Sequence, residues 1–290
     1  MDDKISQSIL IRLGGEIALP AERIVSLVPS LSESVFFLGA GETLVGRTDY
    51  CDRPAGEIED VKKVGGPKSV DVKKVFALDP DVILASREEN EKEQVIELSK
   101  KFPVLLVDPD SPIDTPLIWE ALGEIVGRQE KAMEFAEEVK RELEKLRDIV
   151  DDSDSEAPSF IYFVWKDPWI AAGHDTYISK MLSLAGMKNA LDEKHRRFPQ
   201  MKLEEADGAG ADVHFYCSEP WAFKLPEDIL KYANESADKL EENWFVIGDT
   251  FAAYVDAESL SWYPSRATEG LRYVGALREK LETWISKLSR

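Results

Sequence analysis

Short apolar runs and amphipathic segments alternate along the first third of the chain. Residues 23–28, Arg-Ile-Val-Ser-Leu-Val, form an apolar, β-branched run that is typical of a strand buried on both faces. Similar patterns predict strands at 44–48, 81–85 and 104–107, and helices at 33–38, 70–78 and 88–101. We expect Ser30 or Ser32 to cap the first of these helices. Alternating buried strands and helices indicate an α/β lobe with a mainly parallel sheet.

A long amphipathic segment follows this lobe. Residues 115–150 predict helix almost throughout, and from Ala132 to Val150 apolar residues recur every three or four positions. Glu and Lys fill the opposite face in pairs that favour helix. The acidic segment 151–158 contains turn-forming residues and predicts a link between domains.

The alternation of strands and helices then starts again. The pattern predicts strands at 160–165, 169–172, 213–217 and 244–248, and helices at 177–184, 203–206 and 266–288. We therefore expect two Rossmann-like α/β lobes with mainly parallel sheets, joined by one long helix. The expected bounds are 1–128 for the first lobe, 129–157 for the bridging helix and acidic link, and 158–290 for the second lobe.

The loops after the predicted strands are where a site is expected, because ligands bind beyond the carboxyl ends of parallel strands. In the second lobe, residues 249–251 form one such end, and four tryptophans lie at or near such loops: Trp165, Trp169, Trp221 and Trp262. A Trp in a polar or Pro-flanked loop is costly to expose unless something covers it. Any one of them is best explained as an anchor for its own loop. The four together favour the wall of a cleft for a large, flat or apolar ligand.

Charge and cysteine content exclude several classes of protein. The chain has 36 Lys and Arg against 56 Asp and Glu, a net charge of -20 that would repel a nucleic-acid backbone. Two Cys cannot form a disulfide framework or a Cys-rich zinc site, and Cys51 and Cys217 are interpreted as unrelated free thiols. No stretch approaches the ~20 apolar residues of a membrane span. The acidic start, Met-Asp-Asp-Lys, does not resemble a signal peptide, so the chain as written indicates a cytoplasmic protein unless a signal was removed.

A catalytic or metal site is not supported by the residues. The three His, at 174, 195 and 214, have no ligand spacing, and His214 alternates within a predicted strand as a core residue does. Neither a nucleophile elbow nor a phosphate-binding glycine loop is present in the sequence. Because no nucleophile–base pair can be assembled, the sequence predicts no catalytic residue, no metal ligand and no intrinsic cofactor.

Several segments of the chain resemble one family of proteins. They are Arg23-Ile-Val-Ser-Leu-Val-Pro-Ser-Leu-Ser-Glu33, residues 36–41 and 45–54, Val64-Gly-Gly, and residues 72–84. They are similar to the substrate-binding proteins of ABC importers with a helical backbone (class III), which carry siderophores, haem, metal ions and cobalamin. Among these, the cobalamin receptors and the iron–siderophore-binding members resemble the chain most. The resemblance covers residues 23–288 and is stronger in the first lobe.

The resemblance implies two rigid lobes, a ligand held in the cleft between them, an extracytoplasmic location and delivery to an ABC permease by a monomeric protein. Tyr50 matches a cleft tyrosine of the cobalamin receptors, and Phe198 matches a cleft tryptophan. Ser86 stands near a position where those receptors have tryptophan. Glu204 matches the acidic residue with which the second lobe docks onto the permease, whereas Lys73 stands at the acidic position of the first lobe.

The sequence and the resemblance together predict a set of ligand-binding residues: Tyr50, Ser86, Arg87, Trp165, Trp169, Phe198, Trp221, Trp262, Tyr263 and Arg266. The expected ligand is a small-molecule metal chelate, with a corrinoid such as cobalamin favoured. One alternative is a ferric siderophore, whose negative charge would pair with Arg87, Arg266 or Lys166. Another is haem, which the resemblance implies could be ligated by Tyr50 or Tyr263. An enzyme with an active site in the cleft is the least favoured reading.

Overall fold

The protein folds into two compact α/β units. The structure, a computed structural model, describes residues 9–153, 156–225, 227–230 and 237–288. One unit comprises residues 1–140 with Tyr263–Ser265, and the other comprises residues 141–262 with 266–290. Each unit has a parallel-rich sheet, so the predicted fold class is confirmed. The predicted domain bounds and the predicted cleft stay predictions, and each unit is described by itself.

Unit 1 is built on a six-stranded sheet with the order β1-β8-β7-β2-β3-β4. These strands are β1 Leu10–Leu13, β8 Val104–Val107, β7 Val82–Ser86, β2 Ile24–Ser26, β3 Leu44–Arg47 and β4 Lys62–Lys63. Only β1 pairs antiparallel; the other neighbours are parallel. A separate antiparallel pair joins β5 Gly65–Gly66 to β6 Ser69–Val70. Because β2 and β7 are buried along their whole length, their apolar runs predict them well.

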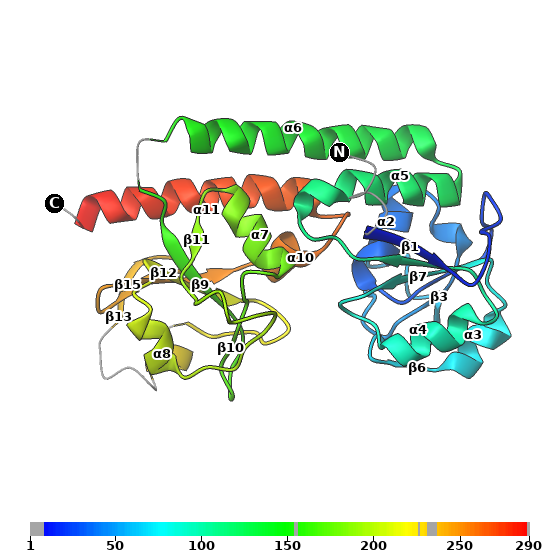
Figure 1. Cartoon of the computed structure of the whole chain (residues 1–290), viewed down its shortest axis with the longest axis horizontal. Coiled ribbons are helices and arrows are strands. Elements are labelled where there is room, and N and C mark those ends of the chain that lie inside the picture. The colour runs from blue at the N-terminus through cyan, green and yellow to red at the C-terminus, as the bar shows by residue number, and fades with distance from the viewer. Residues whose placement is uncertain (1–8, 154–155, 226, 231–236, 289–290) are drawn as a thin grey trace. The chain divides into compact units, whose positions relative to one another are not determined.

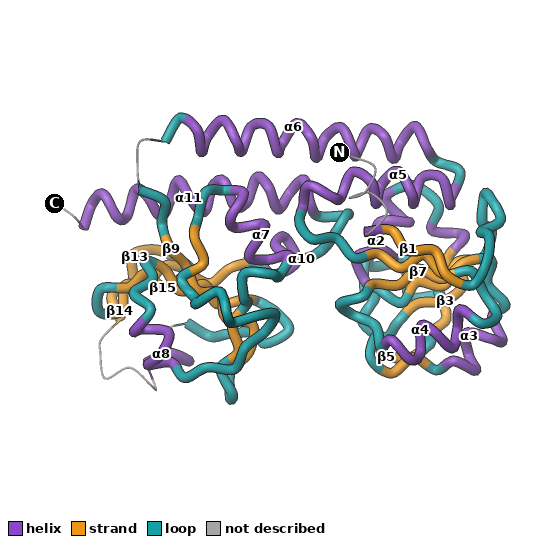
Figure 2. The backbone as a smooth tube through the Cα atoms, viewed as in Figure 1, coloured by secondary structure: helices purple, strands orange, loops and turns teal. Residues whose placement is uncertain are grey.

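Helices cover the unit 1 sheet on both faces (Figures 1 and 2). They are α2 Pro29–Phe37, α3 Val72–Leu78, α4 Lys92–Ser99 and α5 Thr115–Val126. The first part of α6 Gln129–Asp151 packs on α5, where Phe135 contacts Trp119. On the α3 and α4 side, Val75 and Leu98 pack with Val25 and Ile83 in one apolar core. On the other face, α2 and α5 lie against the sheet.

One detail of the unit 1 helices corrects the sequence analysis. Helix α2 begins at Pro29, where the missing N–H of proline costs nothing. Ser30 and Ser32 therefore lie inside the helix and do not cap it, and the Ser32 hydroxyl donates to the Val28 carbonyl instead. The segment 115–150 is helical almost throughout, as predicted, and it forms two helices because Gly127 adopts a left-handed conformation that ends α5 before α6 begins.

Unit 2 is built on a seven-stranded mixed sheet whose main path is β10-β9-β12-β15-β14-β13, with β11 on β9. The strands are β9 Ser159–Trp165, β10 Ile170–Ala171, β11 Lys188–Asn189, β12 Val213–Cys217, β13 Ala237–Glu241, β14 Trp244–Ile247 and β15 Thr250–Val255. The helices are α7 Tyr177–Leu184, α8 Leu203–Gly208, α9 Glu227–Leu230, α10 Ala257–Ser261 and α11 Ala267–Leu288. The centre, β9-β12-β15, is parallel, and β13 and β14 extend it antiparallel.

The position of strand β15 in the sheet shows that one predicted strand end is wrong. Residues 249–251 were expected at the carboxyl edge, but β14 and β15 form a tight hairpin. Because β15 runs parallel to β12, with Phe251 opposite Val213 at the start of β12, this turn lies at the amino end of the parallel strands. It is therefore at the edge opposite to Cys217.

Within unit 2, α6 and α11 are joined by ionic contacts. The buried carboxylate of Glu142 accepts hydrogen bonds from Arg272 at 3.0 Å and from Lys145 at 2.9 Å. The bond from Arg272 is the main reason that the pKa of Glu142 is lowered. The guanidinium of Arg278 is buried and donates to the Ala185 carbonyl and to Glu282. These contacts fix the long helices to the rest of the unit.

The buried His214 of β12 should make the protein sensitive to acid. Burial lowers its pKa to about 4 from an ordinary value of 6.5. The folded chain thus keeps the ring neutral, so this contribution to stability is complete above pH 6.5 and is lost as the pH falls from 6.5 towards 4. We expect the loss to reach about 3 kcal/mol. In the His214→Phe variant, urea unfolding measured at several pH values should show a shallower decline; an unchanged slope would contradict this account.

Candidate functional site

The loop that carries Tyr50 is held in place by a buried arginine. Tyr50 is 68% exposed and follows β3 in unit 1. The Arg47 side chain is buried beneath the loop and donates to the carbonyls of Ile58 at 3.0 Å, Cys51 at 2.8 Å and Thr48 at 3.2 Å. One guanidinium therefore ties together backbone on both sides of Tyr50 and presents its ring to solvent.

Neither cysteine is a reactive thiol. Both Cys51 and Cys217 are free and buried. Burial raises the pKa of Cys51, whose sulfur lies 3.2 Å from the Ser32 hydroxyl and 3.1 Å from that of Thr48. Burial likewise raises the pKa of Cys217 to about 12. Both sulfurs are therefore neutral at physiological pH and serve packing.

Two of the predicted ligand-binding residues bond to each other in unit 1. The Ser86 and Tyr263 hydroxyls lie 2.9 Å apart at the end of β7, and the Ser86 amide donates to the Asn90 side chain at 2.8 Å. Burial of Tyr263 raises its pKa well above the ordinary value. To ligate iron as a phenolate, Tyr263 would have to lose its proton, which its burial opposes. Tyr50, by contrast, is largely exposed.

The aromatic residues of unit 2 fall into an exposed group and a buried group. Trp165 is 36% and Phe198 is 39% exposed, and Trp165 meets Trp221 edge-on with ring centroids 5.2 Å apart. Trp169 is only 6% exposed, and its ring stacks on Phe223 at 5.8 Å. Trp169 therefore packs as a core residue that anchors its own loop.

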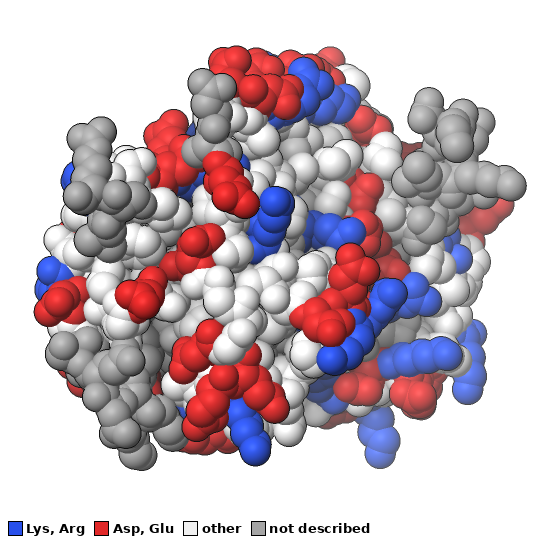
Figure 3. All heavy atoms as spheres, turned by 60° about the vertical axis from the view of Figure 1, so that its left-hand side comes forward, with Lys and Arg blue, Asp and Glu red and all other residues white. Residues whose placement is uncertain are grey.

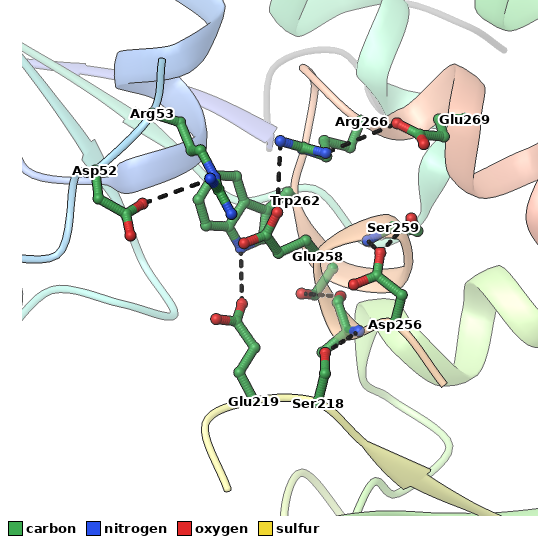
Figure 4. A network of polar contacts seen from close by, with 12 residues as sticks. Asp52, Arg53, Ser218, Glu219, Asp256, Glu258, Ser259, Trp262, Arg266 and Glu269 are labelled. Carbon is green, nitrogen blue, oxygen red and sulfur yellow. Dashed lines mark hydrogen bonds and ion pairs between the residues drawn. The ribbon is translucent and has the colours of Figure 1, made fainter. Parts of the chain in front are cut away.

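Polar contacts on two sides fix the orientation of Trp262 (Figure 4). Its indole N–H donates to Glu219 at 3.1 Å. The guanidinium of Arg266 lies 5.6 Å from the centroid of its ring and pairs with Glu258 at 3.4 Å and Glu269 at 3.8 Å. An indole held in this way is preorganised, because little side-chain freedom remains to be lost on binding.

The cations that were candidates for holding an anionic chelate already have carboxylate partners. Arg87 contacts Asp108 at 2.6 Å, and Lys166 contacts Asp228 at 2.6 Å. Arg266 pairs with Glu258, as described above. Each would have to break or share an ion pair to bind a second anion.

The two predicted docking positions lie on short helices. Glu204 is exposed in the first turn of α8 in unit 2, and Lys73 is exposed in α3 of unit 1.

Among the described residues, no cluster of three or more His, Cys, Asp or Glu side chains is arranged to hold a metal ion. Within the same residues, no helix has the length and apolar character needed to cross a bilayer.

Comparison with known proteins assigns the chain to a family. A model of the periplasmic binding protein family matches residues 24–229, well over half of the chain. The chain belongs to the periplasmic binding protein family. Vitamin B12-binding proteins are similar to it: that of Pectobacterium carotovorum is 25% identical over 189 residues, covering 65% of this chain and 68% of its own, and that of Yersinia pestis is 28% identical over 189 residues, covering 65% and 66%.

Solved periplasmic binding proteins share the fold. The periplasmic vitamin B12 binding protein BtuF of Vibrio cholerae has a TM-score of 0.76 at 20% identity, covering 91% of this chain and 98% of its own. The periplasmic heme-binding protein RhuT of Roseiflexus has a TM-score of 0.71 at 18% identity, covering 90% and 98%. The predicted resemblance to class III substrate-binding proteins is confirmed.

Family membership establishes the general role of this periplasmic binding protein. It is a non-catalytic solute-binding protein, as the sequence predicts. The family binds small-molecule chelates as transported ligands and works with ABC permeases. Membership of this family also implies an extracytoplasmic location. Of the two locations considered from the sequence, the family therefore supports the extracytoplasmic one.

Sequence reasoning missed two residues of the candidate site, Arg47 and Glu219. Arg47 ends a buried strand, and a charged residue in that place is a signal that it has internal partners. Glu219 lies two residues before Trp221, but its bond to Trp262 joins positions 43 residues apart, which the local sequence does not reveal.

Replacing Arg47 tests whether it holds the Tyr50 loop. Arg47→Lys keeps the charge but loses the planar fork that serves three carbonyls. We expect the free energy of unfolding in urea to fall by about 1–3 kcal/mol and proteolysis within residues 48–58 to increase. Arg12→Lys is the matched control, because it alters one exposed ion pair with Glu124. If the two variants behave alike, Arg47 does not hold the loop.

Proposed function

We propose that this periplasmic binding protein captures a corrinoid, with cobalamin ahead of ferric siderophores and haem. The observation that carries the proposal is that the candidate cations are already paired with carboxylates, whereas several candidate aromatic side chains are exposed. Cobalamin brings its own ring ligands to the cobalt. The protein then needs to supply shape, stacking and a few hydrogen bonds. The relatives named as vitamin B12-binding proteins support the same choice.

The net charge supports a ligand without strong negative charge. The chain carries a formal charge of -20, and its Asp and Glu side chains are spread over the face shown in Figure 3. Such a field slows the approach of anions and lowers their local concentration. A neutral corrinoid is not penalised in this way, whereas a highly charged ferric siderophore is.

The proposed contact residues are the aromatic side chains that remain available. They are Tyr50 of unit 1 and Trp165, Phe198, Trp221 and Trp262 of unit 2. Ser86, Tyr263, Arg87 and Arg266 are proposed to support this set through the bonds described above. Trp169 is left out, because its ring is used in the core.

Haem is the second candidate, and Tyr50 is the observation in its favour. The Tyr50 side chain is largely exposed, so its hydroxyl is accessible to iron, and solved heme-binding proteins share the fold.

We further propose that the protein is a monomer that delivers its ligand to an ABC permease, with Glu204 as a docking residue.

Titration with three ligands tests the proposed function. Cyanocobalamin, haemin and a tricatecholate ferric siderophore have distinct visible spectra, so calorimetry and absorbance can be combined on one protein sample. We expect cyanocobalamin to bind at micromolar protein and the anionic siderophore to give no heat. Binding of haemin or the siderophore without cyanocobalamin would overturn the choice of ligand, and turnover of a ligand would overturn the binding role.

Substitution of single aromatic residues tests the contact set. Trp165→Ala and Trp262→Ala should each weaken cyanocobalamin binding by about 1–3 kcal/mol, because each removes an aromatic contact. The fold should survive, as judged by circular dichroism and the thermal midpoint. Trp284→Ala in α11 is the control and should bind normally. If Trp165→Ala and Trp262→Ala bind normally or both unfold, these residues are structural anchors.

Tyr50→Phe separates the two candidate ligands. The variant keeps the ring but loses the hydroxyl, so stacking on a corrinoid should persist while ligation of haem iron should be lost. The measurement is the visible spectrum and affinity with each ligand. Loss of cyanocobalamin binding in Tyr50→Phe, with haemin binding retained, would contradict the roles proposed for this residue.

A further inference from the structure

A hollow lies in unit 2, and none of the residues proposed to contact the chelate lines it. It is a groove of about 710 Å³ between the β13–β14 hairpin, β15 and α11. Its lining falls within residues 241–283, which lie beyond the residues 24–229 that match the family model. Figure 1 shows these elements at the C-terminal end of the colour range. The volume is in the range of small-molecule pockets.

The groove already holds one ammonium group of the protein. Trp244 forms part of its wall, and the Lys280 ammonium lies 5.8 Å from the centroid of the Trp244 ring. The same ammonium forms an ion pair with Glu241. An aromatic face beside a carboxylate is the arrangement that stabilises an organic cation. The position of Lys280 thus shows that this wall can hold an ammonium group.

Two further carboxylates of the groove are not matched in this way. Glu242 and Glu279 are exposed, and within the described residues neither carboxylate has an ion pair or a side-chain hydrogen bond. Three carboxylates therefore face one ammonium, which leaves two negative charges. The wall also includes Tyr254 and Tyr273, both partly exposed. These rings offer surface on which methylene groups can pack.

We propose that this groove binds an aliphatic dication of the diamine or polyamine class. Its ammonium groups pair with Glu242 and Glu279, and its methylene chain packs on Tyr254 and Tyr273. Two unmatched carboxylates select a dication over a single amine, and the aromatic surface in the same groove selects an aliphatic chain over a hydrated metal ion. The site is separate from the proposed chelate contacts and does not depend on them.

Calorimetry with putrescine and spermidine on the full chain tests the proposal. Because an acidic protein attracts any cation, the comparison of variants decides the outcome. The double variant Glu242→Gln with Glu279→Gln should weaken binding about tenfold or more. The double variant Glu93→Gln with Glu97→Gln removes the same charge from exposed positions of α4 and should bind nearly as wild type does. The neutral isostere 1,4-butanediol should not bind.

Three results would overturn the proposal: no binding of either amine at millimolar concentration, equal losses in both double variants, or equal binding of butanediol. The thermal midpoint and circular dichroism of each variant establish that it is folded. Cyanocobalamin titrations of the same variants separate the two proposals, because the groove variants should keep their affinity for the chelate. A failed amine titration leaves the proposed function intact, and a failed cobalamin titration leaves the groove intact.

Discussion

Both units depend on the burial of parallel strands on both faces. A parallel strand must be followed by a crossover that packs on the sheet, so the carboxyl ends of all the parallel strands gather at one edge. In unit 1 this constraint brings the ends of β3 and β7 to the same edge, where Tyr50 follows β3 and Ser86 ends β7. In unit 2 it does the same for β9 and β12, which Trp165 and Cys217 end. The positions of the candidate residues therefore follow from the topology of the two sheets.

The sequence predicts those parts of the fold whose burial is uniform. Strand β12 and helix α7 have the predicted bounds, because a continuous apolar run and a clean amphipathic stripe leave little choice. Strand β1 was missed, since an edge strand of four half-exposed residues lacks such a run. Strand β15 was missed because a two-residue hairpin turn separates it from β14, and the turn resembled the end of a strand.

The candidate site was predictable in residue type but not in partners. Trp165 and Trp169 lie in the same short segment, yet one is exposed and the other is stacked in the core. Their flanking residues do not reveal this difference, because it depends on Phe223 more than fifty positions away. The bond between Ser86 and Tyr263 joins residues 177 positions apart. Contacts between such distant positions decide which side chains remain available to a ligand. These contacts cannot be predicted from a single sequence.

The two proposals share one physical basis, which is the distribution of ion-paired and unpaired charge among the described residues. Arg87, Lys166 and Arg266 are each matched by a carboxylate, so none of these three candidate cations is unshared. In the groove of unit 2 the excess is negative, which leaves room for a cation. Burial of an unmatched charge is costly, and sharing one partner between two anions weakens both pairs. Under the two proposals, ion pairing within the protein determines selectivity by charge: matched cations favour a neutral ligand at the chelate contacts, and unmatched carboxylates favour a positive ligand in the groove.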